Sequence, residues 1–396
     1  MPLITHTRLT KYITVFGACL VSTLFLDALA TPYVPRADAE IIEHLPLDKT
    51  KSVRAELRAL RRQLTQRPDD AALAANLARR YIQQARASGD PRFLGYAQAS
   101  LAPWWGQAQI PLDILVLRAI VRQSNHEFDA ALDDLSAALQ RKPNHVQALL
   151  TRAAVLQVRG EFAAAKRDCL ALVPLTSTLI AYGCVSVVTS LTGQAQASYD
   201  LLQRVLARAA DANEQQWAQG LLAEMAERRG DVRAAQQHYR AALQGPQTDT
   251  YLLAAYADFL LDLGRTTEVV TLLADHTRVD GLLLRLTLAE RAMGAPRFDS
   301  HKDSLRARYA AAQARGDVLH RREQARFELA LENNPPAALK LAQANWAIQR
   351  EPADARILLE AAIAAASPRA ARPVVESLKQ HATQDVRLQT LVRNVP

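Results

Sequence analysis

The residue types that carry most protein chemistry are present in this 396-residue chain, but they do not fall into catalytic patterns. It has no glycine-rich phosphate loop ending in Lys-Ser/Thr, no Gly-x-Ser-x-Gly elbow and no His-Glu-x-x-His helix. The nine histidines are scattered, and Asp133-Asp134 is most simply a solubilising pair on the outer face of a helix. The sequence therefore predicts no enzyme, no cofactor and no metal site.

Two cysteines, Cys169 and Cys184, are the clearest candidates for covalent chemistry. In an oxidising compartment they could form a disulfide, because we expect them on consecutive antiparallel helices on either side of a turn near Pro174. The alternative is that both are small buried apolar residues. The third cysteine, Cys19, follows Phe16-Gly17-Ala18, which is a poor lipoprotein motif.

The elements that position these residues are helical hairpins, and Leu112 to Val173 contains the same hairpin twice. Apolar residues at helical spacing predict helices over 112–124 and 128–141. Pro143 ends the second helix, since proline lacks the backbone donor and its ring clashes one turn back. Adding 34 to a position in the first copy gives its counterpart: Leu115 and Leu149, Ala119 and Ala153, Phe128 and Phe162, Ala131 and Ala165, Leu135 and Cys169.

This pattern resembles the tetratricopeptide repeat, which has small residues, an aromatic residue and a proline at fixed offsets in a period of about 34 residues. The segments Gly95-Tyr96 and Ala344-Asn345-Trp346-Ala347 resemble those of exported proteobacterial members of that family. The resemblance implies an all-α, right-handed superhelical solenoid of helix-turn-helix repeats without a β-sheet. We expect about eight hairpins over residues 67–382, clearest at 112–177 and 214–278.

The first 30 residues have the layout of a secretory signal peptide. Arg8 and Lys11 precede an apolar run from Ile13 to Leu26, and Ala28-Leu29-Ala30 is a small-x-small cleavage site. We expect cleavage after Ala30 and a periplasmic protein, with residues 31–50 as an extended leader. An uncleaved inner-membrane anchor is the alternative, although the run is shorter than the ~20 apolar residues that a spanning helix needs.

The chain is basic, with a formal net charge of +8. Such a balance is typical of nucleic-acid binding, but an exported protein meets no chromosome, so we expect no nucleic-acid partner. Residues 51–66 predict an amphipathic helix with an apolar stripe opposite several arginines. We expect it to cap the solenoid, and the alternative is peripheral contact with an anionic membrane. A short helix within 383–396 should cap the other end.

The family resemblance also implies where a partner would bind, on the first helix of each hairpin along the concave face. In the two clear repeats this groove would contain Asp113, Val116, Ile120, Gln123, Gln147, Leu150 and Gln157. In the two repeats around Gly230 it would contain Trp217, Glu224, Glu227, Tyr251, Asp258 and Asp262.

The second set of groove residues is acidic, which favours a basic or amine-bearing partner. The alternative is that Arg228, Arg229 and neighbouring helices neutralise these carboxylates. Reversing the charge of Glu224, Glu227, Asp258 and Asp262 together should abolish partner capture and leave the melting temperature nearly unchanged.

These features predict a non-catalytic scaffold of the bacterial cell envelope that mediates protein–protein or protein–peptide interactions through its concave face. The alternative is a membrane-associated structural or assembly accessory, held by the basic helix 51–66 or by an uncleaved anchor. A third and weaker hypothesis, an enzyme on a helical toroid, requires a deep pocket with converging carboxylates.

Overall fold

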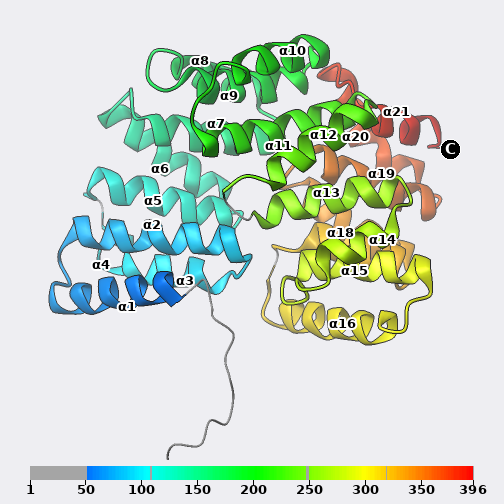
Figure 1. Cartoon of the computed structure of the whole chain (residues 1–396), viewed down its shortest axis with the longest axis horizontal. Helices are drawn as coiled ribbons and strands as arrows, with labels where there is room; N and C mark the ends of the chain where they lie inside the picture. The colour runs from blue at the N-terminus through cyan, green and yellow to red at the C-terminus, as the bar shows by residue number, and fades with distance from the viewer. Residues whose placement is uncertain (1–50, 108, 247–248, 318, 396) are drawn as a thin grey trace, which may run out of the picture. The chain divides into compact units, whose positions relative to one another are not determined.

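The computed structural model describes residues 51–395, except 108, 247–248 and 318 (Figure 1). The predicted signal peptide and leader lie outside these residues. Every regular element in the described part is an α-helix and none is a strand, which confirms the all-α prediction. None of the described helices combines the length and apolar character needed to cross a bilayer.

In the described part of the chain, the helices between α1 and α21 form nine consecutive pairs, where about eight pairs were expected. In chain order they are α1 (Lys51–Gln66), α2 (Ala71–Ser88), α3 (Arg92–Ser100), α4 (Ala102–Trp105), α5 (Leu112–Ser124), α6 (Phe128–Arg141), α7 (Val146–Val158), α8 (Phe162–Ala171), α9 (Thr178–Ser190), α10 (Ala195–Leu206), α11 (Ala212–Arg228), α12 (Val232–Leu243), α13 (Thr250–Asp262), α14 (Thr266–Leu273), α15 (Asp280–Met293), α16 (Phe298–Ala314), α17 (Arg321–Ala330), α18 (Pro335–Trp346), α19 (Pro352–Ala364), α20 (Pro368–Gln380) and α21 (Val386–Arg393).

The two clear repeats show why the period produces hairpins. Ala131 and Ala165 are fully buried in the two hairpins, where a larger side chain would overpack the interior. Gly160 takes the turn with φ +78°, a conformation that costs glycine little. Its counterpart 34 residues earlier is His126, which adopts φ 60° despite its side chain.

The second half of the first hairpin consists of two helices, α3 and α4, which meet at Leu101. Pro103 explains the break, because it has no N–H group to continue the helical hydrogen bonding across this point. Leu101 and Trp104 are both buried in the core beside α2 and α5. The break thus lets the chain turn while its apolar residues remain packed.

Helix α1 packs its apolar stripe against the array. Leu57 is buried in the same core cluster as residues of α2 and α5, and Val53, Leu60 and Leu64 pack against that cluster. Arg61 donates hydrogen bonds of 3.1 and 2.9 Å to the hydroxyl of Tyr81. The stripe that would enter a membrane surface is therefore already in contact with protein, as a capping helix requires.

The C-terminal helices lie along the hairpin turns of the middle repeats, as Figure 1 shows for α20 and α21 beside α10 and α12. The backbone N–H of Arg350 donates to the carbonyl of Val158 at 2.7 Å. The side chain of Thr383 donates to the carbonyl of Leu191 at 3.0 Å, and the side chain of Gln384 accepts from a nearby backbone N–H. The array within residues 52–396 therefore closes on itself, so that distant repeats meet.

Candidate functional site

The expected groove residues of α11 and α13 form one surface, which we call the inner wall: Trp217, Glu224, Glu227, Tyr251, Asp258 and Asp262. Trp217 and Tyr251 are 34 residues apart, as are Glu224 and Asp258, so they occupy equivalent positions on the two helices. The Trp217 ring lies over Gly183 of α9, where an added Cβ would come within 2.5 Å of it. A glycine in α9 therefore makes room for the tryptophan.

The inner wall is accessible to solvent although other helices face it. Tyr251 is 58% exposed and Trp217 is 37% exposed, which is unusual for large aromatic residues in a packed array. Glu351, which precedes α19, and Arg322 of α17 also influence the pKa of Tyr251, which is raised well above its ordinary value mainly by the neighbouring charge of Glu224. Side chains from the C-terminal half therefore lie near the inner wall.

The two aspartates of α13 are paired with arginines from distant helices. Asp258 accepts hydrogen bonds from Arg285 of α15, at 2.6 Å, and from Arg326 of α17. Burial alone would raise the pKa of Asp258, but these two arginines hold it below its ordinary value. Asp262 accepts two hydrogen bonds, of 2.6 and 2.7 Å, from Arg356 of α19. Both carboxylates therefore tie the inner wall to the C-terminal half.

Glu227 is also paired, but it is more deeply desolvated. It forms an ion pair with Arg387 of α21 and accepts a 2.6 Å hydrogen bond from the hydroxyl of Tyr239. Burial raises the pKa of Glu227 to about 7, because these two partners offset only part of the cost of removing its charge from water. This contact joins α21 to the inner wall.

Glu224 differs from the other three carboxylates. Its nearest arginine among the described residues is Arg228, at 3.8 Å, and Arg228 donates instead to the hydroxyl of Ser190 at 3.0 Å. Burial raises the pKa of this carboxyl, and Arg228 and the nearby Tyr251 offset only part of that effect. Glu224 is thus the least neutralised acid of the inner wall.

These pairs change the interpretation of the acidic groove. Most of its charge is neutralised, yet Arg228 and Arg229 play little part, since Arg229 stacks over the Tyr199 ring at 4.4 Å. The neutralising side chains are Arg285, Arg326, Arg356 and Arg387. The expectation that charge reversal would leave the melting temperature unchanged is therefore corrected, because reversal would put like charges together in these pairs.

The first half of the expected groove is only partly available to a partner. Val116 and Ile120 are 3% and 5% exposed and belong to the hydrophobic core, so they are unsuited to partner contacts. Asp113 and Gln147 are exposed, and the remaining three positions, Gln123, Leu150 and Gln157, are half-buried. Within the expected groove, the exposed aromatic residues therefore lie on α11 and α13.

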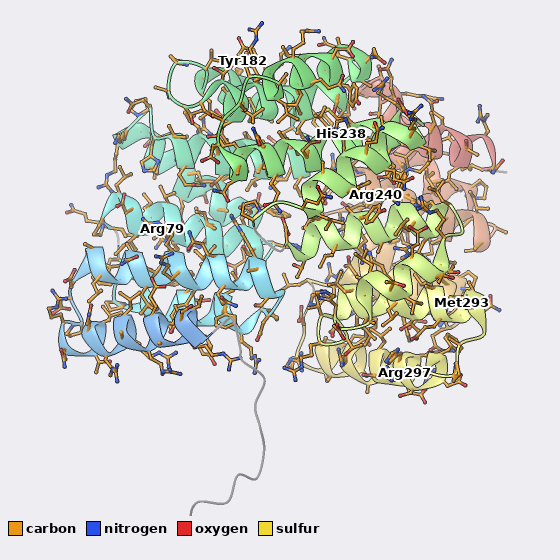
Figure 2. All side chains as sticks on the ribbon, in the orientation of Figure 1. Arg79, Tyr182, His238, Arg240, Met293 and Arg297 are labelled. Atoms are coloured by element: carbon orange, nitrogen blue, oxygen red, sulfur yellow. A yellow bond between two sulfur atoms is a disulfide. The ribbon has the colours of Figure 1, made fainter. Side chains whose placement is uncertain are left out.

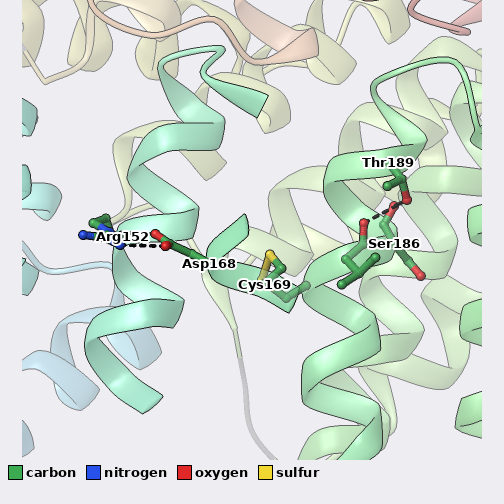
Figure 3. The surroundings of a disulfide bond; sticks show 7 residues. Arg152, Asp168, Cys169, Ser186 and Thr189 are labelled. Carbon is green, nitrogen blue, oxygen red and sulfur yellow. Dashed lines mark hydrogen bonds and ion pairs between the residues drawn. A yellow bond between two sulfur atoms is a disulfide. The ribbon is translucent and has the colours of Figure 1, made fainter. Parts of the chain in front are cut away.

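The two cysteines are joined in a disulfide between α8 and α9 (Figure 3). The Cα atoms of Cys169 and Cys184 are 5.4 Å apart, and the bond closes a loop of 15 residues. Cys169 is fully buried, so this bond links two consecutive repeats inside the array.

Asp134 has a structural role that the sequence interpretation missed. It is 4% exposed and accepts hydrogen bonds from Arg118, at 2.9 and 2.6 Å, and from Arg122, at 2.8 Å. Asp168 repeats the contact one period later, accepting two 2.7 Å bonds from Arg152. Only the exposed Asp133 fits the interpretation of a solubilising pair. The 34-residue spacing of both arginines and both aspartates was visible in the sequence.

Possible metal ligands and pockets bear on the hypothesis of an enzyme on a helical toroid. Among the described residues, no group of three or more His, Cys, Asp or Glu side chains is placed to hold a metal ion. The two best-defined pockets each contain a single carboxylate, Glu376 in one and Asp168 in the other. Neither pocket provides the converging carboxylates that an enzyme on this scaffold would need.

The 34-residue period and the nine helix pairs define the class of protein, a solenoid of tetratricopeptide-like repeats. No protein-family model and no curated protein matches the sequence. The fold is similar to that of a Rap protein complexed with Competence and Sporulation Factor, with a TM-score of 0.45 and 11% identity over 87% of this chain and 95% of that one.

Two further solved structures are similar. The Cut9 and Hcn1 assembly of APC/C matches with a TM-score of 0.38 and 14% identity over 78% of this chain, which spans only 52% of that chain. A tetratricopeptide repeat protein from Parabacteroides merdae matches with a TM-score of 0.31 and 14% identity, over 72% of this chain and 98% of that one. These TM-scores are too low to assign the function of any of the three proteins to this chain.

Proposed function

We propose that this chain is a non-catalytic scaffold of the bacterial cell envelope that binds a protein or peptide partner at the inner wall. The observation that carries the proposal is the exposure of Trp217 and Tyr251, at 37% and 58%, at equivalent positions of adjacent repeats. Aromatic residues are enriched at protein interfaces, because they provide large contact areas at a low entropic cost.

The ion pairs of α11 and α13 support the same proposal. Asp258, Asp262 and Glu227 hold α11 and α13 to α15, α17, α19 and α21. A surface whose backbone is held in this way loses little freedom when a partner binds, and less of the binding energy is then spent on ordering it. The inner wall is therefore suited to recognition without large rearrangement.

The proposed location rests on two observations. Residues 1–30 have the layout of a signal peptide, and the chain pairs Cys169 with Cys184 in a disulfide. Structural disulfides persist in oxidising compartments such as the periplasm and are rare in the bacterial cytosol. Both observations favour an exported protein.

The test is a pull-down from envelope extract with the chain starting at Thr31. We expect the double variant Trp217→Ala/Tyr251→Ala to lose the partners that the wild type captures. The matched control is Tyr96→Ala, because Tyr96 is 46% exposed but belongs to α3, away from the inner wall. If the double variant captures the same partners as the control, the binding surface lies elsewhere.

The membrane-associated accessory is separated from this proposal by the mass of the mature protein. A chain that begins at Thr31 and washes off membranes in high salt excludes an uncleaved anchor. Because the apolar stripe of α1 already packs against the array, we expect replacement of Arg54 and Arg58 by glutamine to leave fractionation unchanged.

A further inference from the structure

The four C-terminal helices α18–α21, which we call the C-terminal unit, have a hydrophobic core of their own. Trp346, Leu358 and Val374 lie in this core, and α17 adds Ala325 to it. Helix α17 also reaches the central core, through Phe327. None of the other described hydrophobic clusters contains a residue of the C-terminal unit. Among the described helices, α17 is therefore the one through which hydrophobic packing continues from the middle repeats into the C-terminal unit.

The C-terminal unit meets the middle repeats along a line of loops, which we call the seam. One side of the seam consists of the turns α7–α8, α9–α10 and α11–α12, and the other of the loops α18–α19 and α20–α21 with the first turn of α21. At the first of these turns, the backbone N–H of Arg350 donates to the carbonyl of Val158 at 2.7 Å. The Phe162 and His381 rings meet edge to face there, with their centroids 4.7 Å apart.

The second turn, α9–α10, receives polar groups from the α20–α21 loop. The hydroxyl of Thr383 donates to the carbonyl of Leu191 at 3.0 Å, and the side chain of Gln384 accepts from the N–H of Ala195 at 3.0 Å. Ala195 begins α10, whose own N-cap residue makes no side-chain capping bond. The C-terminal unit thus satisfies backbone groups at the end of α9 and at the start of α10.

The third turn, α11–α12, lies beside ion pairs between the C-terminal unit and the inner wall. Arg387 pairs with Glu227 and, at 3.3 Å, with Asp262, which also accepts two hydrogen bonds from Arg356. These four side chains are between 10% and 30% exposed, so dissolved salt can screen their charges. The Nε atom of Arg387 is buried without a hydrogen-bond partner among the described residues, which offsets part of the gain from its ion pairs.

The seam is therefore held by contacts that are individually weak. Hydrogen bonds and partly exposed ion pairs contribute little net free energy, because water satisfies the same groups when the partners separate. The hydrophobic cores lie on either side of the seam and do not cross it in the described array. Local openings that expose little apolar surface need less free energy than global unfolding. The seam can thus separate while the helices on both sides remain packed.

We propose that the seam is a clasp, at which the C-terminal unit separates from the turns of the middle repeats by movement about α17 while both sides stay folded. In the closed clasp, Arg356 and Arg387 hold Asp262 and Glu227 of the inner wall. Opening releases these two carboxylates to solvent, so the clasp sets how rigidly the inner wall is presented. The clasp goes beyond the proposed function, and its test requires no partner.

The test is hydrogen exchange of the chain from Thr31, followed by mass spectrometry. The reporters are peptides that contain Arg350 and Ala195, because each of these backbone N–H groups donates across the seam. We expect Arg387→Gln to raise the opening of the seam about tenfold, through loss of a charge-assisted contact. In the wild type, raising the NaCl concentration from about 0.05 to about 0.5 M should raise it about threefold, because salt screens partly exposed ion pairs. Peptides from the centres of α9 and α19 should exchange more slowly and unchanged.

Arg240→Gln is the matched control for Arg387→Gln. Arg240, labelled in Figure 2, is exposed on α12 and pairs with Glu268 of α14 at 3.9 Å. Its replacement removes one arginine from a helix that borders the seam without touching the contacts of Arg387. We expect the reporter peptides of Arg240→Gln to exchange like those of the wild type.

A disulfide across the seam tests the clasp in the opposite direction. The Cβ atom of Val386 lies 3.9 Å from the position that a Cβ atom would take at Gly230, a separation that suits a disulfide. The oxidised variant Gly230→Cys/Val386→Cys should slow exchange of the reporter peptides about tenfold or more relative to Gly230→Ser/Val386→Ser. The serine variant has the same backbone strain at the positive φ of residue 230 but forms no bond.

Three results would overturn the clasp. The first is exchange of the reporter peptides at the rate of the centres of α9 and α19, since the seam would then open only on global unfolding. The second is an effect of Arg387→Gln that is confined to the start of α21 and absent at Arg350, which would indicate local fraying. The third is equal exchange in the cysteine and serine variants. The salt comparison uses the wild type and therefore does not depend on the folding of any variant.

Discussion

The ion pairs of the two clear repeats join residues that are close in the chain, whereas most of those of the inner wall join residues that are far apart. Arg118 pairs with Asp134, and Arg152 with Asp168, across 16 residues in each case and within one hairpin. The carboxylates of the inner wall pair across the fold. Asp258 reaches Arg326, 68 residues away, Asp262 reaches Arg356, 94 residues away, and Glu227 reaches Arg387, 160 residues away.

The difference shows two levels of organisation in one array. In an open repeat array each repeat contacts only its neighbours, and stability is close to a sum of local terms. The pairs within α5–α8 fit that description. The pairs of the inner wall add long-range links, so α11 and α13 depend on α17, α19 and α21. Variants at the two kinds of pair should therefore behave differently.

The largest effect is expected at a local pair. Asp134→Ala leaves Arg118 and Arg122 without their shared buried carboxylate, and breaking such a contact costs about 3–5 kcal/mol. Urea denaturation measures this change in the free energy of unfolding. Asp133→Ala, next to it on the exposed face, should stay within about 0.5 kcal/mol of wild type. Similar losses for the two variants would contradict the distinction between them.

The disulfide comes next, because it also acts between neighbouring repeats. Replacing Cys169 and Cys184 with serine should lower the free energy of unfolding by roughly 3 kcal/mol, the value expected for a loop of this size. Mass spectrometry of the unreduced protein after periplasmic expression checks the bond directly. Two free thiols would show that it does not form, and a variant as stable as wild type would show that it contributes nothing.

A long-range pair should have a smaller effect on stability but a wider effect on dynamics. Arg387→Gln should cost about 1–2 kcal/mol, since Glu227 can take up a proton when its partner is lost. Hydrogen exchange should accelerate in α21 and also in α11, on opposite sides of the contact. Arg393→Gln, at the end of α21, is the control. Faster exchange confined to α21 would mean that the link does not hold the inner wall.

The smallest effect is a change in the slope of stability against pH. The pKa of Glu227 is raised to about 7 from an ordinary value of 4.5, so the folded protein binds its proton more tightly than the unfolded chain does. Its stabilising contribution is therefore complete below about 4.5 and is lost as the pH rises through about 7. Glu227→Gln should flatten this part of the profile, and Glu161→Gln, at an exposed turn, should not. Parallel profiles for Glu227→Gln and wild type would contradict the raised pKa.

Much of the local structure was readable from the sequence. Helices over 112–124 and 128–141 were expected, and α5 and α6 have these bounds, because apolar spacing and Pro143 act within a few residues. The recurrence of Arg118 and Asp134 34 positions later was visible, but Asp134 was interpreted as a solubilising residue and its pairing with Arg118 was missed. The break before Pro103 was likewise visible as a missing backbone donor.

The sequence by itself thus determined the helices, the period and the candidate cysteine pair, because each of these depends on neighbours in the chain. Tertiary structure alone decided that Val116 and Ile120 are buried and that Arg326, Arg356 and Arg387 reach the inner wall. The physical reason is that each repeat is rotated slightly relative to the one before it. The rotation accumulated along the array determines which distant helices meet. The sequence of a single hairpin does not reveal this accumulated rotation.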